Sequence, residues 1–231
     1  MIECLLFDLF GTLVEYEPER AGHLYPETCD LIRDELPALT RDQIIAGINA
    51  VFGKLELDSH RNHTEFHMNQ VASGVCEHLG IEPEQSFCAA FVETYIREWL
   101  VPIKPVSGVT GLLHRLSKHY LLGVVSNTHY APIVHQLITK MGLTEILEVV
   151  TLSIDVGVPK PNPEIFQLTL AALDLTAAQV VYIGDSYESD YRGARNAGID
   201  CYLIGRHARV PRERQLRSIL DLSIYFNTAR Q

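Results

Sequence analysis

Five short apolar runs, nearly continuous in Val, Ile, Leu and Tyr, constrain the fold of this chain more than any other feature. They lie at residues 3–7, 120–125, 147–152, 180–183 and 201–204. Runs without polar alternation are typical of strands that are buried on both faces of a sheet. Segments with helical periodicity lie between the later runs, at residues 109–119, 131–141, 163–173 and 188–197. Strands that alternate with helices predict an α/β fold with a Rossmann-like parallel sheet.

The segment from residue 14 to residue 103 does not follow this alternation. It contains amphipathic patterns around residues 18–36, 40–55, 64–79 and 83–99, and no strand signal interrupts them. Pro102 and Pro105 mark the end of this segment, where the alternation of strands and helices resumes. We therefore expect a core domain of residues 1–13 and 104–231 and a helical domain of residues 14–103 inserted after the first strand.

Carboxylates follow two of the apolar runs at the point where each strand is expected to end. Asp8 follows the first run, and Gly11 and Thr12 after it allow a sharp turn. Asp185 follows the fourth run, and Asp190 comes five residues later near an expected helix start. A carboxylate at a strand end can act as a nucleophile, and several together form the oxygen-rich set that Mg²⁺ prefers.

Two further polar segments lie in comparable places. Ser126 and Asn127 follow the second apolar run, where a hydroxyl and backbone N–H groups can hold a phosphoryl oxygen. Lys160 lies in the proline-rich loop VPKPNP of residues 158–163, whose backbone is stiff. A lysine held in this way is suited to orient a carboxylate and to neutralise charge on a transferred group.

These four segments, at residues 5–13, 124–127, 157–161 and 181–190, resemble in order the four motifs of the haloacid dehalogenase superfamily. The resemblance implies an α/β core with an inserted helical cap, and a cap that closes can exclude water and select the substrate. It implies that Asp8 is the nucleophile and that Ser126 and Lys160 assist it. It also implies substrate binding by Thr12, Ser126, Asn127 and Lys160. The Mg²⁺ ligands implied are Asp8, the backbone carbonyl of Phe10, Asp185 and Asp190.

Phe10 departs from the phosphatase pattern of this superfamily. Most of its phosphatases carry an Asp there as general acid and base, whereas its dehalogenases tend to carry an aromatic residue. A proton donor in place of that Asp would be Glu15, Tyr16 or His129, which neighbour the motifs. A dehalogenase would also need an arginine to receive halide, and Arg20 is the candidate near the start of the insert.

The fourth motif favours a Mg²⁺-dependent phosphatase that acts on a small phosphorylated metabolite through an aspartyl-phosphate. The superfamily's dehalogenases need no metal and typically have Ser-Asn-type residues where this chain has Gly184 and Asp185. The alternatives are a 2-haloacid dehalogenase with Asp8 as nucleophile and a weakly active binding protein with the same fold.

The composition of the chain limits the kinds of partner that it is expected to bind. Nineteen Lys and Arg against 29 Asp and Glu give a formal net charge of −10, which repels nucleic acid. The chain has no stretch of about 20 apolar residues for a membrane span and no leader pattern at its start. Five scattered cysteines without CxxC spacing fit buried thiols in a reducing compartment. We expect a cytoplasmic monomer or homodimer with a small-molecule substrate.

Overall fold

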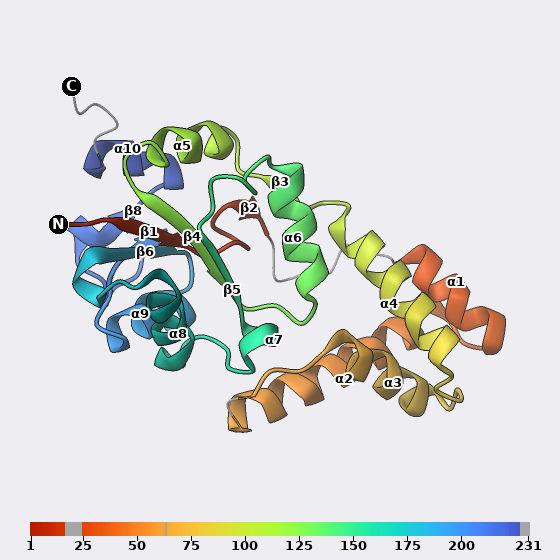
Figure 1. The fold of residues 1–231 in the computed structure, drawn as a ribbon. Coiled ribbons are helices and arrows are strands. Elements are labelled where there is room, and N and C mark those ends of the chain that lie inside the picture. The colour runs from red at the N-terminus through yellow and green to blue at the C-terminus, as the bar shows by residue number, and fades with distance from the viewer. Residues whose placement is uncertain (17–24, 63, 227–231) are drawn as a thin grey trace. The chain divides into compact units, whose positions relative to one another are not determined.

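The computed structural model describes residues 1–16, 25–62 and 64–226 and divides the chain into two compact units (Figure 1). The first unit consists of Met1–Glu17 and Lys104–Gln231, and the second of Pro18–Ile103. The division falls beyond residue 13 because strand β2 (Val14–Glu15) pairs antiparallel with β3 (Lys104–Pro105) inside the first unit. Strands of two residues leave no periodic signal, so the sequence did not reveal this pair.

The first unit is built on a six-stranded sheet in the order β5-β4-β1-β6-β7-β8, and every neighbouring pair is parallel. This confirms the predicted α/β fold with a Rossmann-like sheet. The chain runs outward from β1 to β5 and then crosses back to β6, so the strand order reverses beside β1. The strands are β1 (Cys4–Phe7), β4 (Leu121–Ser126), β5 (Val149–Leu152), β6 (Val180–Gly184), β7 (Asp200–Ile204) and β8 (Gln215–Leu216).

Helices cover both faces of this sheet: α5 and α10 lie on one face, and α8 and α9 on the other (Figure 1). The α-helices of the unit are α5 (Val109–Leu116), α6 (Ala131–Lys140), α7 (Ser153–Val156), α8 (Pro163–Leu173), α9 (Gly193–Asn196) and α10 (Leu222–Tyr225). Short 3₁₀ turns are η1 (Ala177–Gln179), η3 (Arg212–Arg214) and η4 (Ile219–Asp221). Buried side chains of the sheet pack with α8 and α9 in one apolar cluster, which includes Cys4, Leu6, Phe166 and Tyr182. This packing holds the central strands in register.

The helix predicted at residues 188–197 is divided in two. Its first part is the π-helical turn η2 (Tyr187–Arg192), and α9 forms the second part. The Asp190 carboxylate turns back and accepts a hydrogen bond from the Ser186 N–H at 2.9 Å. This bond accompanies the wider turn, a geometry that occurs frequently at functional sites.

The described residues of the second unit form four helices: α1 (Pro26–Glu35), α2 (Arg41–Asn62), α3 (Met68–Leu79) and α4 (Gln85–Leu100). The first turn of α1 is capped by Glu98 of α4, a largely buried residue. Its carboxylate accepts hydrogen bonds from the N–H groups of Glu27 and Thr28 at 2.8 and 3.0 Å and from the Thr28 hydroxyl at 2.6 Å. Tyr25 stacks on Tyr95 of α4, with ring centroids 4.7 Å apart. These contacts join α1 firmly to α4.

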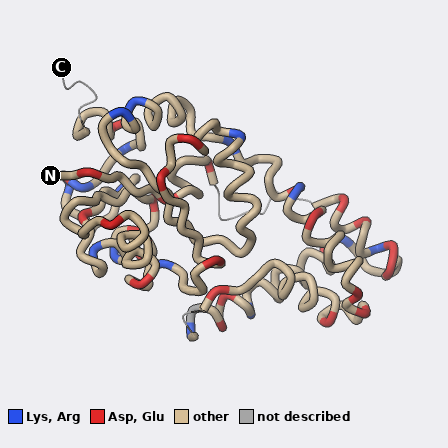
Figure 2. The backbone as a smooth tube through the Cα atoms, viewed as in Figure 1, with Lys and Arg blue, Asp and Glu red and all other residues tan. Residues whose placement is uncertain are grey.

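Acidic residues are spread over both units (Figure 2), as the net charge of −10 requires. No helix within the described residues combines the length and the hydrophobicity needed to cross a bilayer.

Candidate active site

Three of the predicted site residues follow adjacent parallel strands at one edge of the sheet. Asp8 follows β1, Ser126 ends β4 and Asp185 follows β6, and β1 pairs with both of the others. The Asp8 N–H donates to the Ile183 carbonyl at 2.9 Å, so the β1–β6 pairing extends to the carboxylate-bearing residue. This is the edge, beside the strand-order reversal, where open α/β sheets bind ligands.

Three carboxylates converge at this edge. One oxygen each from Asp8, Asp185 and Asp190 lies within 4.8 Å of the others. Asp8 and Asp190 are buried, with 6% and 1% of their surface exposed, whereas Asp185 is open to solvent. Although Asp185 is exposed as a residue, its carboxyl is partly covered, and this partial burial, followed by the charge of Asp190, raises the pKa of Asp185.

Lys160 is the cation of the site and is 5% exposed. Its Nζ donates to the Oδ1 atoms of Asp8 and Asp190, both at 2.7 Å, and to the Tyr182 hydroxyl at 2.8 Å. Burial acts to lower the pKa of Lys160, but the carboxylates of Asp190 and Asp8 more than offset it and raise the value to about 12. All three ammonium donors have acceptors, so Lys160 supplies a fixed positive charge and does not act as a proton donor.

Tyr182 is a member of the site that sequence reasoning missed. It is fully buried in β6, and its ring meets Phe166 edge to face at 5.1 Å. Its oxygen accepts from Lys160 and lies 2.9 Å from the Val125 carbonyl and 3.1 Å from Asp190 Oδ1. Burial, followed by the charges of Asp190 and Asp8, raises the pKa of Tyr182 well above its ordinary value, so it stays neutral. The available sequence signal for this role was the tyrosine hydroxyl, a single polar atom within an otherwise apolar run that needs a hydrogen-bond partner when buried.

Two glycines allow the backbone to approach the carboxylates. Gly11 has φ +85°, and a Cβ there would lie 2.3 Å from Asp185 Oδ2. A Cβ on Gly184 would lie 2.4 Å from Asp190 Cγ. Any other residue at either position would displace a carboxylate.

Asn127 positions the Lys160 loop. Its side-chain Oδ1 accepts from the Lys160 N–H at 2.8 Å, and its Nδ2 donates to the Lys160 carbonyl at 2.9 Å. Thr12 donates to Asp185 Oδ1 at 3.4 Å, and the Ser126 side chain is buried beside Asn127. Asp8, Lys160, Asp185 and Asp190 thus lie together at one edge, with Thr12 bonded to Asp185 and with Ser126 and Asn127 at the end of the adjacent β4, while substrate contact by Thr12, Ser126 and Asn127 stays a prediction.

Phe10 occupies the turn between Asp8 and β2, where it forms an isolated bridge with Val14. Its ring packs against Tyr16, with centroids 5.8 Å apart and an interplanar angle of 55°. Glu15 is exposed and His129 is half-buried. Arg20, the candidate halide receptor, lies outside the described residues.

The donor set fits a divalent cation. Three carboxylates share the site with one ammonium group, which leaves a surplus of two negative charges when all are ionised. Burial is the main cause that raises the pKa of Asp8 to about 7; Lys160 acts against it, and the charges of Asp190 and Asp185 add to it. Hard oxygen ligands of this kind suit a cation such as Mg²⁺.

Comparison with known proteins gives the family to which this chain is similar. The model of the family described as "Haloacid dehalogenase-like hydrolase" matches residues 34–204, more than half of the chain. An N-acetylmuramic acid 6-phosphate phosphatase of Pseudomonas putida is 31% identical over 85% of this chain and 80% of its own length. A glyceraldehyde 3-phosphate phosphatase of Methanopyrus kandleri is 27% identical over 86% of this chain and 82% of its own.

Solved structures agree in fold. A 2-haloacid dehalogenase from Pseudomonas syringae pv. Tomato superposes with a TM-score of 0.75 at 19% identity, covering 97% of both chains. A HAD phosphatase from Thermococcus onnurineus superposes with a TM-score of 0.67 at 20% identity, covering 100% of both. Because both activities occur on this fold, structural similarity alone does not distinguish between them.

Proposed function

The chain belongs to the haloacid dehalogenase-like hydrolases, and on that premise we propose that it is a Mg²⁺-dependent phosphatase of small phosphorylated metabolites. The observation that carries this proposal is the convergence of three carboxylates at one site, two of which are paired with a single lysine. Displacement of halide from carbon needs no metal, so a dehalogenase has no use for the surplus negative charge. The two relatives named above are both named for the hydrolysis of sugar-type phosphate esters, which supports this substrate class.

In the proposed reaction, an oxygen of the Asp8 carboxylate attacks phosphorus while the bond from phosphorus to the ester oxygen breaks. The departing oxygen takes a proton, and an aspartyl-phosphate remains. Water then attacks the phosphorus, loses a proton and releases phosphate, which restores the Asp8 carboxylate. Asp8, the Phe10 carbonyl, Asp185 and Asp190 would hold Mg²⁺. When bound, Mg²⁺ offsets negative charge on the phosphoryl oxygens.

Lys160 and its partners prepare Asp8 for this attack. The ammonium group fixes Asp8 Oδ1 at 2.7 Å and stays protonated, so it stabilises negative charge throughout the reaction. Asp190, which would also be a metal ligand, accepts from the same ammonium group at the same distance and helps to hold Lys160 in place. Thr12, Ser126 and the backbone at Asn127 are proposed to bind the phosphoryl oxygens.

The source of the proton for the departing oxygen is not given by the usual residue of this family. Phe10 has no acidic group, so we expect aryl phosphates, whose leaving group needs no proton, to be better substrates than alkyl phosphates. Phe10→Asp should raise the ratio of alkyl to aryl turnover. An unchanged ratio, with alkyl phosphates already good substrates, would assign the proton transfer to Glu15, Tyr16 or His129.

The unit Pro18–Ile103 is proposed to be the helical cap that selects the substrate, in a cytoplasmic monomer or homodimer. The decisive assay measures phosphate release from p-nitrophenyl phosphate, with and without Mg²⁺. We expect EDTA and Asp8→Asn each to abolish release, and Asp34→Asn, at an exposed position of α1, to leave it unchanged. Metal-independent halide release from a 2-haloacid would establish the dehalogenase instead. No turnover of either substrate class would favour the weakly active binding protein.

A further inference from the structure

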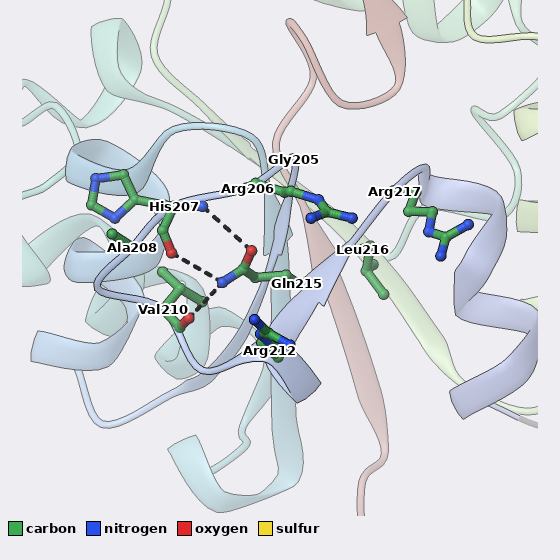
Figure 3. A pocket seen from close by; sticks show the side chains of 9 residues that line it. All are labelled: Gly205, Arg206, His207, Ala208, Val210, Arg212, Gln215, Leu216 and Arg217. Atoms are coloured by element: carbon green, nitrogen blue, oxygen red, sulfur yellow. Dashed lines mark hydrogen bonds between the residues drawn. The ribbon is translucent and has the colours of Figure 1, made fainter.

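A cavity lies beside β8 and the loop that joins it to β7 (Figure 3). It is a cavity of about 640 Å³ lined mainly by the loop that follows β7 and by β8. Among its lining residues are Arg206, His207, Arg212, Gln215 and Arg217, whereas Asp8, Lys160 and Asp185 are not among them. β7 is the second strand from β1, a lateral separation of about 10 Å at ordinary strand spacing. The cavity is therefore separate from the carboxylate site.

The lining of this cavity is basic in an acidic protein. It carries three guanidinium groups, from Arg206, Arg212 and Arg217, and no carboxylate. Within the part of the chain that the structure describes, none of the three forms an ion pair. Arg214, which does not line the cavity, is paired with Asp200 at 2.6 Å.

Two acidic residues lie nearby in the sequence. Glu213 is exposed and does not line the cavity. The Asp221 carboxylate accepts from the backbone N–H of Arg217 and of Ser218, at 2.9 and 3.3 Å, and so serves the turn after β8. Neither carboxylate neutralises a guanidinium group of the cavity, which leaves three positive charges available to a ligand.

The cavity wall is held by specific contacts. The Gln215 side-chain Nε2 donates to the carbonyls of His207, at 3.0 Å, and Val210, and its Oε1 accepts from the His207 N–H at 3.4 Å (Figure 3). The His207 ring stacks on Tyr187 with centroids 3.7 Å apart. The loop therefore needs little ordering before a ligand binds, which favours affinity.

We propose that this cavity binds a small molecule that carries two or more phosphate groups, at a site separate from Asp8. A guanidinium group matches a phosphate oxygen pair with two parallel hydrogen bonds, and three guanidinium groups around one cavity match a ligand with more than one anionic group. The volume of about 640 Å³ is within the range of small-molecule sites. This inference does not depend on the proposed phosphatase activity.

The test is a titration of the ¹⁵N-labelled protein with pyrophosphate, in EDTA and at constant ionic strength. We expect saturable shifts of the Gln215 side-chain amide and of the Arg206 and His207 backbone signals. The double variant Arg206→Gln/Arg212→Gln should weaken this binding at least tenfold. Arg33→Gln/Arg97→Gln, which removes the same charge from exposed positions of the second unit, should change it by less than twofold.

Four results would overturn the proposal. One is a linear response without saturation, and a second is an equal loss of affinity in both double variants. The third is a set of shifts confined to Gly11, Gly184 and their neighbours, which would place pyrophosphate at the carboxylate site alone. A parallel titration with citrate separates phosphate from carboxylate recognition, because saturable binding of citrate without pyrophosphate would contradict the ligand class. The substituted arginines are exposed, so both variants are expected to fold.

Discussion

Replacement of Lys160 by Met tests whether the buried ammonium group holds the carboxylate site together. Met preserves most of the side-chain volume, so the change removes a charge and three hydrogen bonds without opening a large cavity. Loss of one partner from a buried ion pair typically costs about 3–5 kcal/mol, because the other charge is left uncompensated. We expect a fall of this size in the unfolding free energy of the metal-free protein at pH 9.

The loss should be smaller at pH 6. The pKa of Asp8 is already raised to about 7 by burial, and removal of the ammonium group raises it further. A carboxyl whose folded-state pKa is raised contributes stability at low pH that is lost as the pH rises through that value. The variant therefore loses stability relative to the native protein from about pH 7 upward, at up to about 1.4 kcal/mol for each pH unit.

The assay is urea unfolding in EDTA, followed by far-ultraviolet circular dichroism at both pH values. Fluorescence is unsuitable because the single tryptophan, Trp99, belongs to the second unit. Lys118→Met, at an exposed position of the first unit, is the control and should change the free energy by less than about 0.5 kcal/mol. A loss below about 1 kcal/mol at pH 9, or an equal loss at both pH values, would refute the role assigned to Lys160.

Three other predictions concern Tyr182, Glu98 and Asp8, whose contacts are described above. Tyr182→Phe removes the hydroxyl beneath Lys160, and we expect urea unfolding to show a loss of about 1–3 kcal/mol; a neutral effect would contradict that contact. Glu98→Ala uncaps α1 and should cost about 1–3 kcal/mol by Trp99 fluorescence, whereas Glu93→Ala, at an exposed position of the same helix, should cost under about 1 kcal/mol. Because burial raises the pKa of Asp8 to about 7, protons compete with Mg²⁺ for this carboxylate. Calorimetry should therefore show the affinity of the protein for Mg²⁺ falling about tenfold for each pH unit below that value. An Mg²⁺ affinity independent of pH would exclude Asp8 as a ligand.

Sequence alone determined the fold class and the edge at which the carboxylates meet. Strands buried on both faces of a parallel sheet must be apolar along their whole length, so β1, β4 and β6 were recognisable as uninterrupted runs. Because parallel strands end at the same edge, the positions of Asp8 and Asp185 after two such runs were sufficient to bring them together. Ser126, Lys160 and Asp190 were predicted to join them from the order of the four motifs along the chain.

Only the tertiary structure decided which side chains complete the site. Tyr182 lies in an apolar run and has the pattern of a core residue, and its contact with Lys160 depends on the register of β6 and on the path of a loop 22 residues away. The amide of Asn127 is similarly directed to the Lys160 backbone by the placement of two distant loops. The basic cavity beside β8 could not be predicted from the sequence, because β8 has only two residues and such a short strand leaves no periodic pattern. Local periodicity encodes burial, whereas contacts between distant segments depend on strand order and register, which no local pattern contains.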